Sequence, residues 1–191
     1  MTQPGIAVFG GSFNPPHVGH VMLMSAALSL LPISRLWVVP CGCHPLTKQL
    51  VGFEHRLRMV HLATLPFGDR VVVSDIERSL TQPSYTLHTL QALRAQLPLR
   101  EKIFLLLGGD TWREREHWYC FDLVEKMCEI VVFNRGDQRV TDHLPLGDIP
   151  EISSTTVRDL LRRGLPVSTL LPIPVAAYCR GHNLYSAGGP Q

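Results

Sequence analysis

Two histidines, three residues apart, end a glycine- and proline-rich loop, GGSFNPPHVGH, at residues 10–20. Gly10 and Gly11 let the backbone approach a ligand closely, and the two prolines stiffen the turn. A helix starting near residue 18 would offer unpaired backbone amides to an anion. His17 and His20 can donate hydrogen bonds to phosphate oxygens there and stabilise the charge that builds up during phosphoryl or nucleotidyl transfer. Taken alone, the His-x-x-His spacing also fits a metal pair or a solvated helix cap.

A second candidate phosphate site lies far along the chain, in the segment ISSTTVR at residues 152–158. Ser153, Ser154 or Thr155 can cap a helix there, and Arg158 follows about one turn later. The amides of the first turn and the guanidinium would then face a bound polyphosphate together. An ordinary Ser/Thr cap with an exposed arginine also explains this segment, but two such helix starts in one chain favour a shared polyphosphate.

Other phosphate and metal motifs fit less well. The first loop matches neither G-x-G-x-x-G nor G-x-x-x-x-G-K-[ST], which disfavours a dehydrogenase and a P-loop ATPase. Cys41, Cys43 and His44 form the sequence CGCH, but a zinc knuckle has two residues between its cysteines and a second pair elsewhere. The five cysteines also do not suggest a disulfide framework. We therefore expect buried thiols and a turn, with no protein metal site.

The composition is that of an ordinary folded domain. The chain has 191 residues, of which 45% are hydrophobic and 18% are charged, so it can bury a core of its own. Its net charge of +2 comes without a basic cluster, which argues against a nucleic-acid or membrane surface. Because no apolar run approaches the roughly 20 residues of a membrane span and no signal-peptide pattern is present, we expect a cytoplasmic protein.

The hydrophobic pattern supplies a scaffold for these loops. Short apolar, β-branched runs predict strands at residues 6–9, 36–39, 71–73, 103–107 and 130–133. Amphipathic stretches between them predict helices at residues 18–31, 53–65, 85–97 and 118–127. This alternation is typical of βαβ units. It predicts an α/β fold with a Rossmann-like, doubly wound parallel sheet in three α/β/α layers, as a single domain over residues 1–191.

The predicted sheet also predicts where the chemistry lies. Ligands of such sheets bind beyond the carboxyl ends of the strands. The segments at those ends are GGSFNPPHVGH, PCGCHPLTK, GGDTW and NRGD. We expect residues 136–150, which are rich in Pro, Asp and Gly, to form a surface loop, and residues 186–191 to form a mobile tail.

Several motifs give the chain a resemblance to a known family. GGSFNPPHVGH resembles the [ST]-x-G-H signature of the nucleotidyltransferase superfamily, and ISSTTVR resembles its ISSTxxR motif. Further segments are similar to bacterial nicotinate-nucleotide adenylyltransferases, in family order over nearly the whole chain: PSYTLHTL (83–90), GGDTW (108–112), HWY (117–119), FNRG (133–136) and LLPIPVAAYCRGHNLY (170–185). The end motifs indicate the superfamily, and PSYT with the later Trp-Tyr indicates its pyridine-nucleotide branch.

The resemblance implies transfer of AMP from ATP to nicotinate mononucleotide, with Mg²⁺, giving deamido-NAD and pyrophosphate. It implies that His17, His20 and Arg158 are catalytic, with His20 the contact to the transition state. The residues implied in ATP binding are Gly10, Gly11, Ser12, Phe13, Asp110, Arg135, Ser153, Ser154 and Thr155. Asp110 would contact a ribose hydroxyl or lie near Mg²⁺, and its alternative is an ordinary acidic residue at a helix start.

The resemblance also implies an acceptor site formed by Tyr85, Thr86, Trp118 and Lys48. An indole face can stack on a pyridine ring, and backbone amides near Thr86 can accept its carboxylate. Ordinary core packing is the alternative for Tyr85 and Trp118. The chain departs from the family after the second strand, where PCGCHPLTK replaces a Pro-Pro-His-[Lys/Arg] segment. Lys48 or His44 would then make the phosphate contact.

Three other functions share part of this pattern. Nicotinamide mononucleotide differs from the acid only in an amide, and a sequence does not show where the discriminating donors point. Phosphopantetheine adenylyltransferases resemble the chain only at its two end motifs. A nucleotide-binding regulator without turnover would lack a catalytic residue, whereas both histidines, the serines and Arg158 are present. Arg56, in FEHRLRM, has either a structural or a binding role, and a homo-oligomer stays open.

Overall fold

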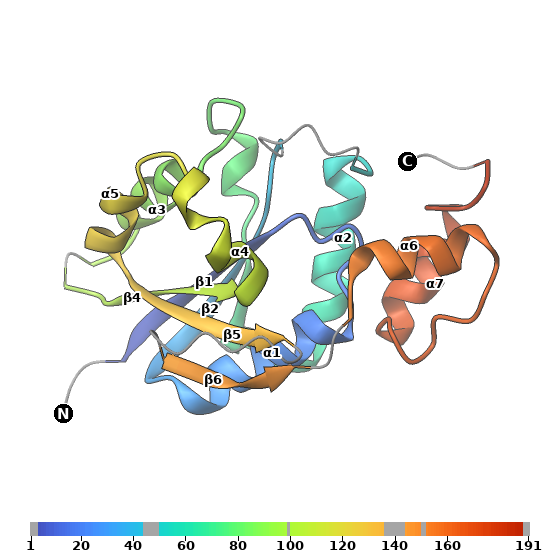
Figure 1. Cartoon of the computed structure of the whole chain (residues 1–191), viewed down its shortest axis with the longest axis horizontal. Helices are drawn as coiled ribbons and strands as arrows, with labels where there is room; N and C mark the ends of the chain where they lie inside the picture. The colour runs from blue at the N-terminus through green and yellow to red at the C-terminus, as the bar shows by residue number, and fades with distance from the viewer. Residues whose placement is uncertain (1–3, 44–49, 99, 136–143, 150–151, 189–191) are drawn as a thin grey trace.

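The computed structural model describes residues 4–43, 50–98, 100–135, 144–149 and 152–188. Six strands form one sheet in the order β3-β2-β1-β4-β5-β6, and every neighbouring pair is parallel (Figure 1). The strands are β1 (Gly5–Gly11), β2 (Ile33–Pro40), β3 (Val71–Val73), β4 (Ile103–Gly108), β5 (Glu129–Arg135) and β6 (Leu144–Ile149). The Rossmann-like parallel sheet predicted from the sequence is therefore confirmed.

The strands are apolar on both sides because helices cover both faces of the sheet. In β1, Ala7 and Phe9 belong to one hydrophobic cluster, and Ile6 and Val8 belong to another. This alternation follows from the two-residue period of a strand. The three α/β/α layers are the result.

Seven α-helices are described: α1 (Val18–Leu30), α2 (Phe53–Thr64), α3 (Thr86–Arg94), α4 (Gly109–Arg113), α5 (Phe121–Met127), α6 (Ser154–Arg162) and α7 (Ile173–Gly181). Short 3-10 helices are η1 (Leu65–Arg70), η2 (Ile76–Arg78) and η3 (Arg115–His117). Residues of α1 and α2 pack in the cluster on one face of the sheet, and residues of α3 and α5 pack in the cluster on the other. Helices α6 and α7 form a third cluster with α2, at one end of the molecule (Figure 1).

The expectation of a surface loop over residues 136–150 was wrong for residues 144–149, which form the edge strand β6. The reason is the sequence LPLGDI, in which Pro145, Gly147 and Asp148 hide the strand pattern. A proline is tolerated at the edge of a sheet, where one side of the backbone needs no partner. Residues 136–143 and 150 lie outside the described residues, as do residues 189–191 of the expected tail.

The strand order positions the site. The chain leaves β3 at one edge of the sheet and returns as β4 on the other side of β1, so the order reverses between β1 and β4. Ligands of doubly wound sheets bind in the crevice at such a point. Helix α1 follows β1 on one face, and α3 precedes β4 on the other, so the crevice lies between their first turns. No helix in the described part of the chain is both long and apolar enough to cross a lipid bilayer.

Candidate active site

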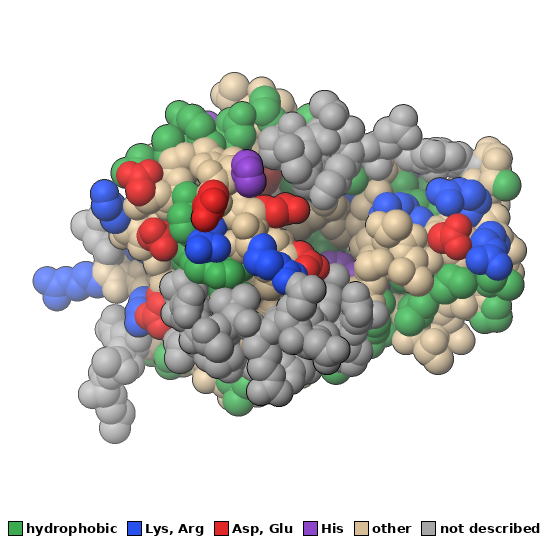
Figure 2. All heavy atoms as spheres, in the orientation of Figure 1, with side chains coloured by type: hydrophobic (Ala, Val, Ile, Leu, Met, Phe, Trp, Pro, Cys, Tyr) green, Lys and Arg blue, Asp and Glu red, His purple; other side chains and the backbone are tan. Residues whose placement is uncertain are grey.

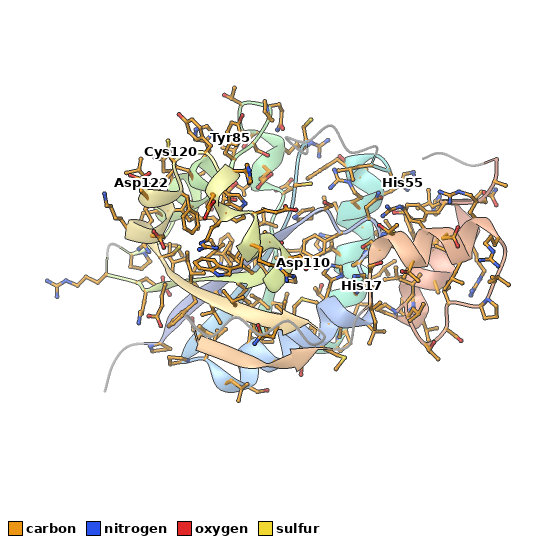
Figure 3. All side chains as sticks on the ribbon, viewed as in Figure 1. His17, His55, Tyr85, Asp110, Cys120 and Asp122 are labelled. Atoms are coloured by element: carbon orange, nitrogen blue, oxygen red, sulfur yellow. The ribbon has the colours of Figure 1, made fainter. Side chains whose placement is uncertain are left out.

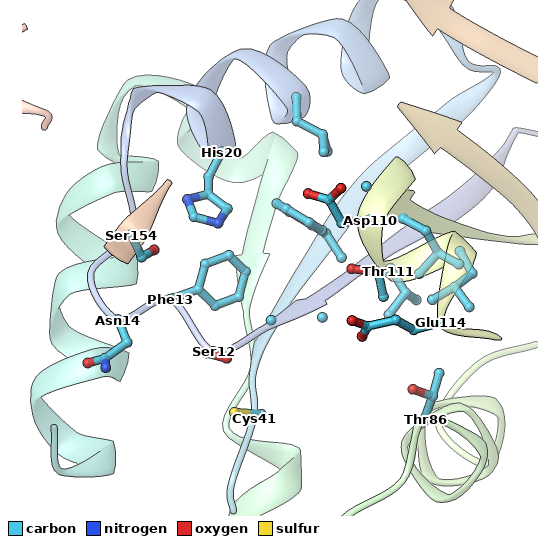
Figure 4. A pocket seen from close by; sticks show the side chains of 18 of the residues that line it. Ser12, Phe13, Asn14, His20, Cys41, Thr86, Asp110, Thr111, Glu114 and Ser154 are labelled. Atoms are coloured by element: carbon cyan, nitrogen blue, oxygen red, sulfur yellow. The ribbon is translucent and has the colours of Figure 1, made fainter. Parts of the chain in front are cut away.

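A cavity of about 950 Å³ opens at this edge of the sheet. Its lining includes twelve of the residues singled out in the sequence: Gly10, Gly11, Ser12, Phe13, His20, Tyr85, Thr86, Asp110, Trp118, Ser154, Thr155 and Arg158. Figure 4 shows His20, Phe13 and Ser154 on one side of it, with Asp110, Thr111 and Glu114 opposite. The two candidate phosphate segments therefore share one cavity.

The charges on the visible face of the molecule are mixed. Figure 2 shows lysine and arginine side chains interspersed with aspartate and glutamate over the described surface. Such a surface gives no extended field of one sign to attract a polyanion. Recognition of phosphate must therefore come from individual groups inside the cavity.

His20 lies in the first turn of α1, with its side chain in the cavity wall. Its Nδ1 accepts a 3.0 Å hydrogen bond from the backbone N–H of His17. An imidazole nitrogen that accepts carries no proton, so the neutral ring holds its proton on Nε2. The ring of Phe13 packs at an angle against the His20 ring, with centroids 5.1 Å apart. These contacts fix both the orientation of the ring and the nitrogen that donates.

His17 lies behind His20. Its side chain is 1% exposed and is not among the residues that line the cavity, and its ring centroid is 3.7 Å from that of His20. Figure 3 shows it at the start of α1. A Cβ on Gly19 would come within 3.1 Å of Cε1 and Nδ1 of the His17 ring, so the glycine leaves room for that ring. His17 thus supports His20, and direct contact of its side chain with phosphate stays a prediction.

Helix α6 brings the second segment to the same loop. Ser153 is its N-cap, and the Ser153 Oγ accepts a 3.1 Å hydrogen bond from the Thr156 N–H. The Ser154 Oγ donates to the carbonyl of Pro15 over 3.0 Å, and Arg158 Nη1 donates to the carbonyl of Asn14 over 2.8 Å. Burial lowers the pKa of Arg158, but an arginine remains a cation at neutral pH.

Asn14 and Tyr185, whose side chains connect the loop after β1 to the C-terminal part of the chain, were not singled out from the sequence. Asn14 is 3% exposed, and its Oδ1 accepts hydrogen bonds from the Tyr185 hydroxyl at 2.8 Å and the Val51 N–H at 3.2 Å. Tyr185 is buried and adopts a left-handed backbone, with φ of 64°. Both residues lie within matched motifs, but neither type suggested chemistry. They join the loop after β1 to the segment after α7.

Three of the four predicted acceptor residues, Tyr85, Thr86 and Trp118, line the cavity. Tyr85 is the N-cap of α3, and its ring stacks on that of Tyr119, with centroids 4.8 Å apart and planes 29° apart. Trp118 lines the cavity and also packs edge-on against Phe121, with centroids 5.8 Å apart. Trp118 thus lines the cavity, as an acceptor residue would, and also packs against a neighbouring ring. Tyr119 is half exposed and also lines the cavity; it was named from the sequence within the HWY motif but not as a site residue.

Asp110 is the second residue of the short helix α4, which starts directly after β4. Its carboxylate pairs with Arg113, three residues later, and its side chain lines the cavity (Figures 3 and 4). Within the described ranges, no group of three His, Cys, Asp or Glu side chains is arranged to hold a metal ion.

Five predicted residues make no described side-chain contact with the cavity: His17, which is buried behind His20, and four others. Lys48 and His44 lie outside the described residues. Arg135 ends β5, and its side chain is likewise outside them. Ser153 caps α6 and does not line the cavity. In the CGCH segment, Cys43 is exposed, and burial raises the pKa of the partly buried Cys41 thiol.

Comparison with known proteins gives consistent matches. A family model described as cytidylyltransferase-like matches residues 8–160. A protein of Myxococcus xanthus, named "Probable nicotinate-nucleotide adenylyltransferase", is 37% identical over 183 residues, which cover 94% of each chain. A protein of the same name from Chlorobium limicola is 32% identical over 196 residues, which cover 94% of this chain and 98% of that protein.

A solved structure has the same fold. The nicotinic acid mononucleotide adenylyltransferase of Plasmodium falciparum, complexed with NaAD, matches with a TM-score of 0.80 and 21% identity, covering 94% of this chain and 96% of that one. At this identity the likeness concerns the fold alone. The sequence relatives and the family model go further, because they match most of the chain at higher identity or over its motifs. The chain therefore belongs to the cytidylyltransferase-like nucleotidyltransferases, and within them to the nicotinate-nucleotide adenylyltransferase family.

Proposed function

We propose that this protein transfers the AMP moiety of ATP to nicotinate mononucleotide, forming deamido-NAD and releasing pyrophosphate. The observation that carries the proposal is the shared cavity of about 950 Å³, whose lining includes His20 and Arg158 together with Tyr85 and Trp118. A triphosphate and a pyridine nucleotide can lie in it together. The membership of the chain in this family supports the same assignment.

The reaction needs positioning more than covalent chemistry. A phosphate oxygen of the mononucleotide attacks the α-phosphorus of ATP in line, a new P–O bond forms, and the bond to the β-phosphate oxygen breaks. No side chain becomes a nucleophile, so the catalytic contribution is orientation and stabilisation of charge. His20 would donate from Nε2 to a phosphate oxygen whose charge rises in the transition state. Arg158 and Ser154 would hold the departing pyrophosphate.

The remaining predicted residues are assigned to ATP binding in this proposal. The backbone from Gly10 to Phe13 would pass close to the nucleotide, and Thr155 would add a hydroxyl beside the phosphates. Asp110 would bind a ribose hydroxyl or approach Mg²⁺. Arg135 and Ser153 stay candidate ATP contacts, and His17 stays a candidate catalytic contact to the phosphates as well as a support for the ring of His20.

Mg²⁺ would enter with ATP. The Asp110 carboxylate supplies the oxygen donor that Mg²⁺ prefers, and such sites commonly combine one or two carboxylates with phosphate oxygens and water. When bound, the ion would neutralise phosphate charge. The chain's own contribution at this wall is to keep Asp110 oriented, through its pair with Arg113.

The acceptor half would recognise the pyridine ring and its carboxylate. Trp118 offers an indole face, Tyr85 stands at the start of α3, and Lys48 is the candidate contact to the acceptor phosphate. Backbone N–H groups near Thr86 would donate hydrogen bonds to the carboxylate, which carries a charge that the amide analogue lacks. This distinction favours the acid as substrate. The proposal includes a cytoplasmic location and excludes nucleic acid as a partner.

A panel of acceptors tests the function. Purified protein with ATP and Mg²⁺ should release pyrophosphate fastest with nicotinate mononucleotide, slower with nicotinamide mononucleotide, and at background rate with phosphopantetheine. The measurement is pyrophosphate release, with identification of the dinucleotide by mass. An equal or greater rate with another acceptor would overturn the assigned specificity. Binding of ATP without turnover of any acceptor would support a regulator in place of an enzyme.

A further inference from the structure

A buried carboxylate outside the assigned site organises the acceptor segment. Glu77, in η2, is 7% exposed and lines the back of the cavity. Its Oε2 accepts a 3.0 Å hydrogen bond from the Gly42 N–H and a short one from the Ser84 hydroxyl. Its Oε1 accepts from the Thr89 hydroxyl at 2.7 Å. A buried acidic group is stabilised only when such donors surround it, so Glu77 and these three donors form one unit.

The donors come from segments that meet at the start of α3. Ser84 lies two residues before Thr86, the first residue of the helix, and Thr89 lies in its first turn. The side-chain amide of Gln82 donates to the Glu77 carbonyl at 2.9 Å, which holds the preceding loop to the same residue. Glu77 therefore fixes the place and direction in which the backbone of residues 82–86 enters α3.

The same unit reaches the phosphate loop through Gly42. Arg56 is 2% exposed, and its Nη2 donates to the Gly42 carbonyl at 3.2 Å. Its Nη1 donates to the carbonyls of Cys41 at 2.7 Å and Ser12 at 3.1 Å. Residue 42 thus binds a buried cation through its carbonyl and a buried carboxylate through its N–H. These contacts correspond to the structural role, one of the two roles that the sequence left open for Arg56.

Only glycine fits at this junction. A Cβ on Gly42 would lie 2.7 Å from the Gln82 side-chain nitrogen and 2.8 Å from the Glu77 carbonyl oxygen. The loop after β2 and the segment before α3 are therefore in close backbone contact. The hydrogen bonds of Glu77 to both segments hold them in this relative position.

We propose that Glu77 is a positioning residue that sets the discrimination between the acid and amide forms of the acceptor. It holds the backbone near Thr86, whose amides would receive the carboxylate, in a fixed place relative to the phosphate loop. This inference rests on the proposed function. Loss of the Glu77 contacts would let these amides move, which weakens recognition of a charged carboxylate more than that of a neutral amide.

The test compares kcat/KM for the two mononucleotides. Glu77→Ala should lower the ratio of the acid to the amide by about tenfold or more, because hydrogen-bonding sites discriminate strongly only when their donors are in place. The KM for ATP should change by less than about threefold, since Arg56 still holds the carbonyls of Ser12 and Cys41 in the variant. Glu77→Gln should recover most of the selectivity, because its carbonyl can accept from Gly42 and Ser84 while its amide donates to Thr89.

Controls separate positioning from stability. Ile33→Ala removes a core side chain at the far end of β2, and it should lower the melting temperature with the selectivity ratio unchanged. If Glu77→Ala does not fold, Ser84→Ala and Thr89→Val each remove one of the three donors and should each lower the ratio by about threefold. Equal losses for both acceptors, or a ratio that stays constant or rises, would overturn the positioning role.

The wild-type protein distinguishes the two proposals. If it transfers AMP to neither mononucleotide, or prefers the amide, the proposed function itself fails. If it prefers the acid and the Glu77, Ser84 and Thr89 variants keep that preference, only the positioning role fails. Calorimetric binding of nicotinate mononucleotide to each variant gives the same comparison without turnover.

Discussion

The Arg158 guanidinium donates a 2.8 Å hydrogen bond from Nη1 to the backbone carbonyl of Asn14, although 144 residues separate the two in the chain. Its Nη2 donates to the Thr155 hydroxyl over 3.2 Å. One side chain thus ties α6 to the loop before α1. The cation that would grip a phosphate also helps to build the cavity, so its removal should affect both binding and stability.

Replacement of Arg158 tests this double role. Arg158→Lys keeps the charge but not the planar fork, so it should raise the KM for ATP and lower kcat by about tenfold. Arg158→Ala should lower kcat/KM further and also lower the melting temperature. Arg163→Ala is the matched control, because Arg163 is exposed and pairs only with Asp159 among its described ionic contacts. An Arg158→Lys enzyme with wild-type kinetics would contradict the predicted phosphate contact.

His20→Ala should lower kcat by two or more decades, about the loss expected for one transition-state donor. The fold should persist, because the His20 side chain lies in the cavity wall. Steady-state kinetics and circular dichroism measure the two quantities. The control is His61→Ala, an exposed histidine on α2 that should leave kcat unchanged. Turnover near the wild-type rate in the His20 variant would refute its catalytic role.

Trp118→Ala should raise the KM for the acceptor by about tenfold, the scale of a lost stacking contact, with little change in the KM for ATP. Some stability should also be lost, because Trp118 packs on Phe121. Phe121→Leu removes that packing and leaves the indole in place, so it should reduce stability without raising the KM for the acceptor. An unchanged acceptor KM in Trp118→Ala would leave the residue with a packing role only.

The Cys179 thiol predicts how stability changes at alkaline pH. Burial raises its pKa from 9.0 to about 12. Between these values the unfolded chain loses the thiol proton while the folded protein keeps it, so the folded state binds more protons. The free energy of unfolding should therefore fall with rising pH by up to about 1.4 kcal/mol per pH unit from this group.

Urea unfolding between pH 8 and pH 11 measures the effect, compared with a Cys179→Ala variant. The difference between the two slopes isolates this thiol from other groups that titrate in the same range. Cys43→Ala, which changes an exposed thiol, should follow the wild-type slope. If the free energy of unfolding falls equally with pH in wild type and in Cys179→Ala, the pKa of the buried thiol is not raised as stated.

The sheet was predictable because its signals are local. Runs such as residues 6–9 carry alternate side chains to two buried faces, and the glycine-rich loop stands at a strand end. Strand β6 was not predicted because Pro145 and Gly147 break the pattern of a strand. It forms by pairing with β5, and this pairing is not visible in its own sequence. Local periodicity cannot show such long-range pairing.

The site was predictable as a set of residue types, but not in its support. The motifs brought His20, Arg158 and Trp118 together correctly as residues of one cavity. They did not show that His17 is buried behind His20, because both carry the same ring. The bond from Tyr185 to Asn14 spans 171 residues and involves types common in any loop. Burial and partner choice arise from packing, which single motifs do not encode.

The bond between Tyr185 and Asn14 has a consequence for the order in which the cavity is completed during translation. The cavity walls from the first loop to Trp118 precede α6 and Tyr185 in the chain, so they are synthesised first. The hydrogen bond that holds the Asn14 side chain can form only after residue 185 has been made. Truncation just before that residue should therefore leave a cavity that admits a mononucleotide but grips ATP poorly.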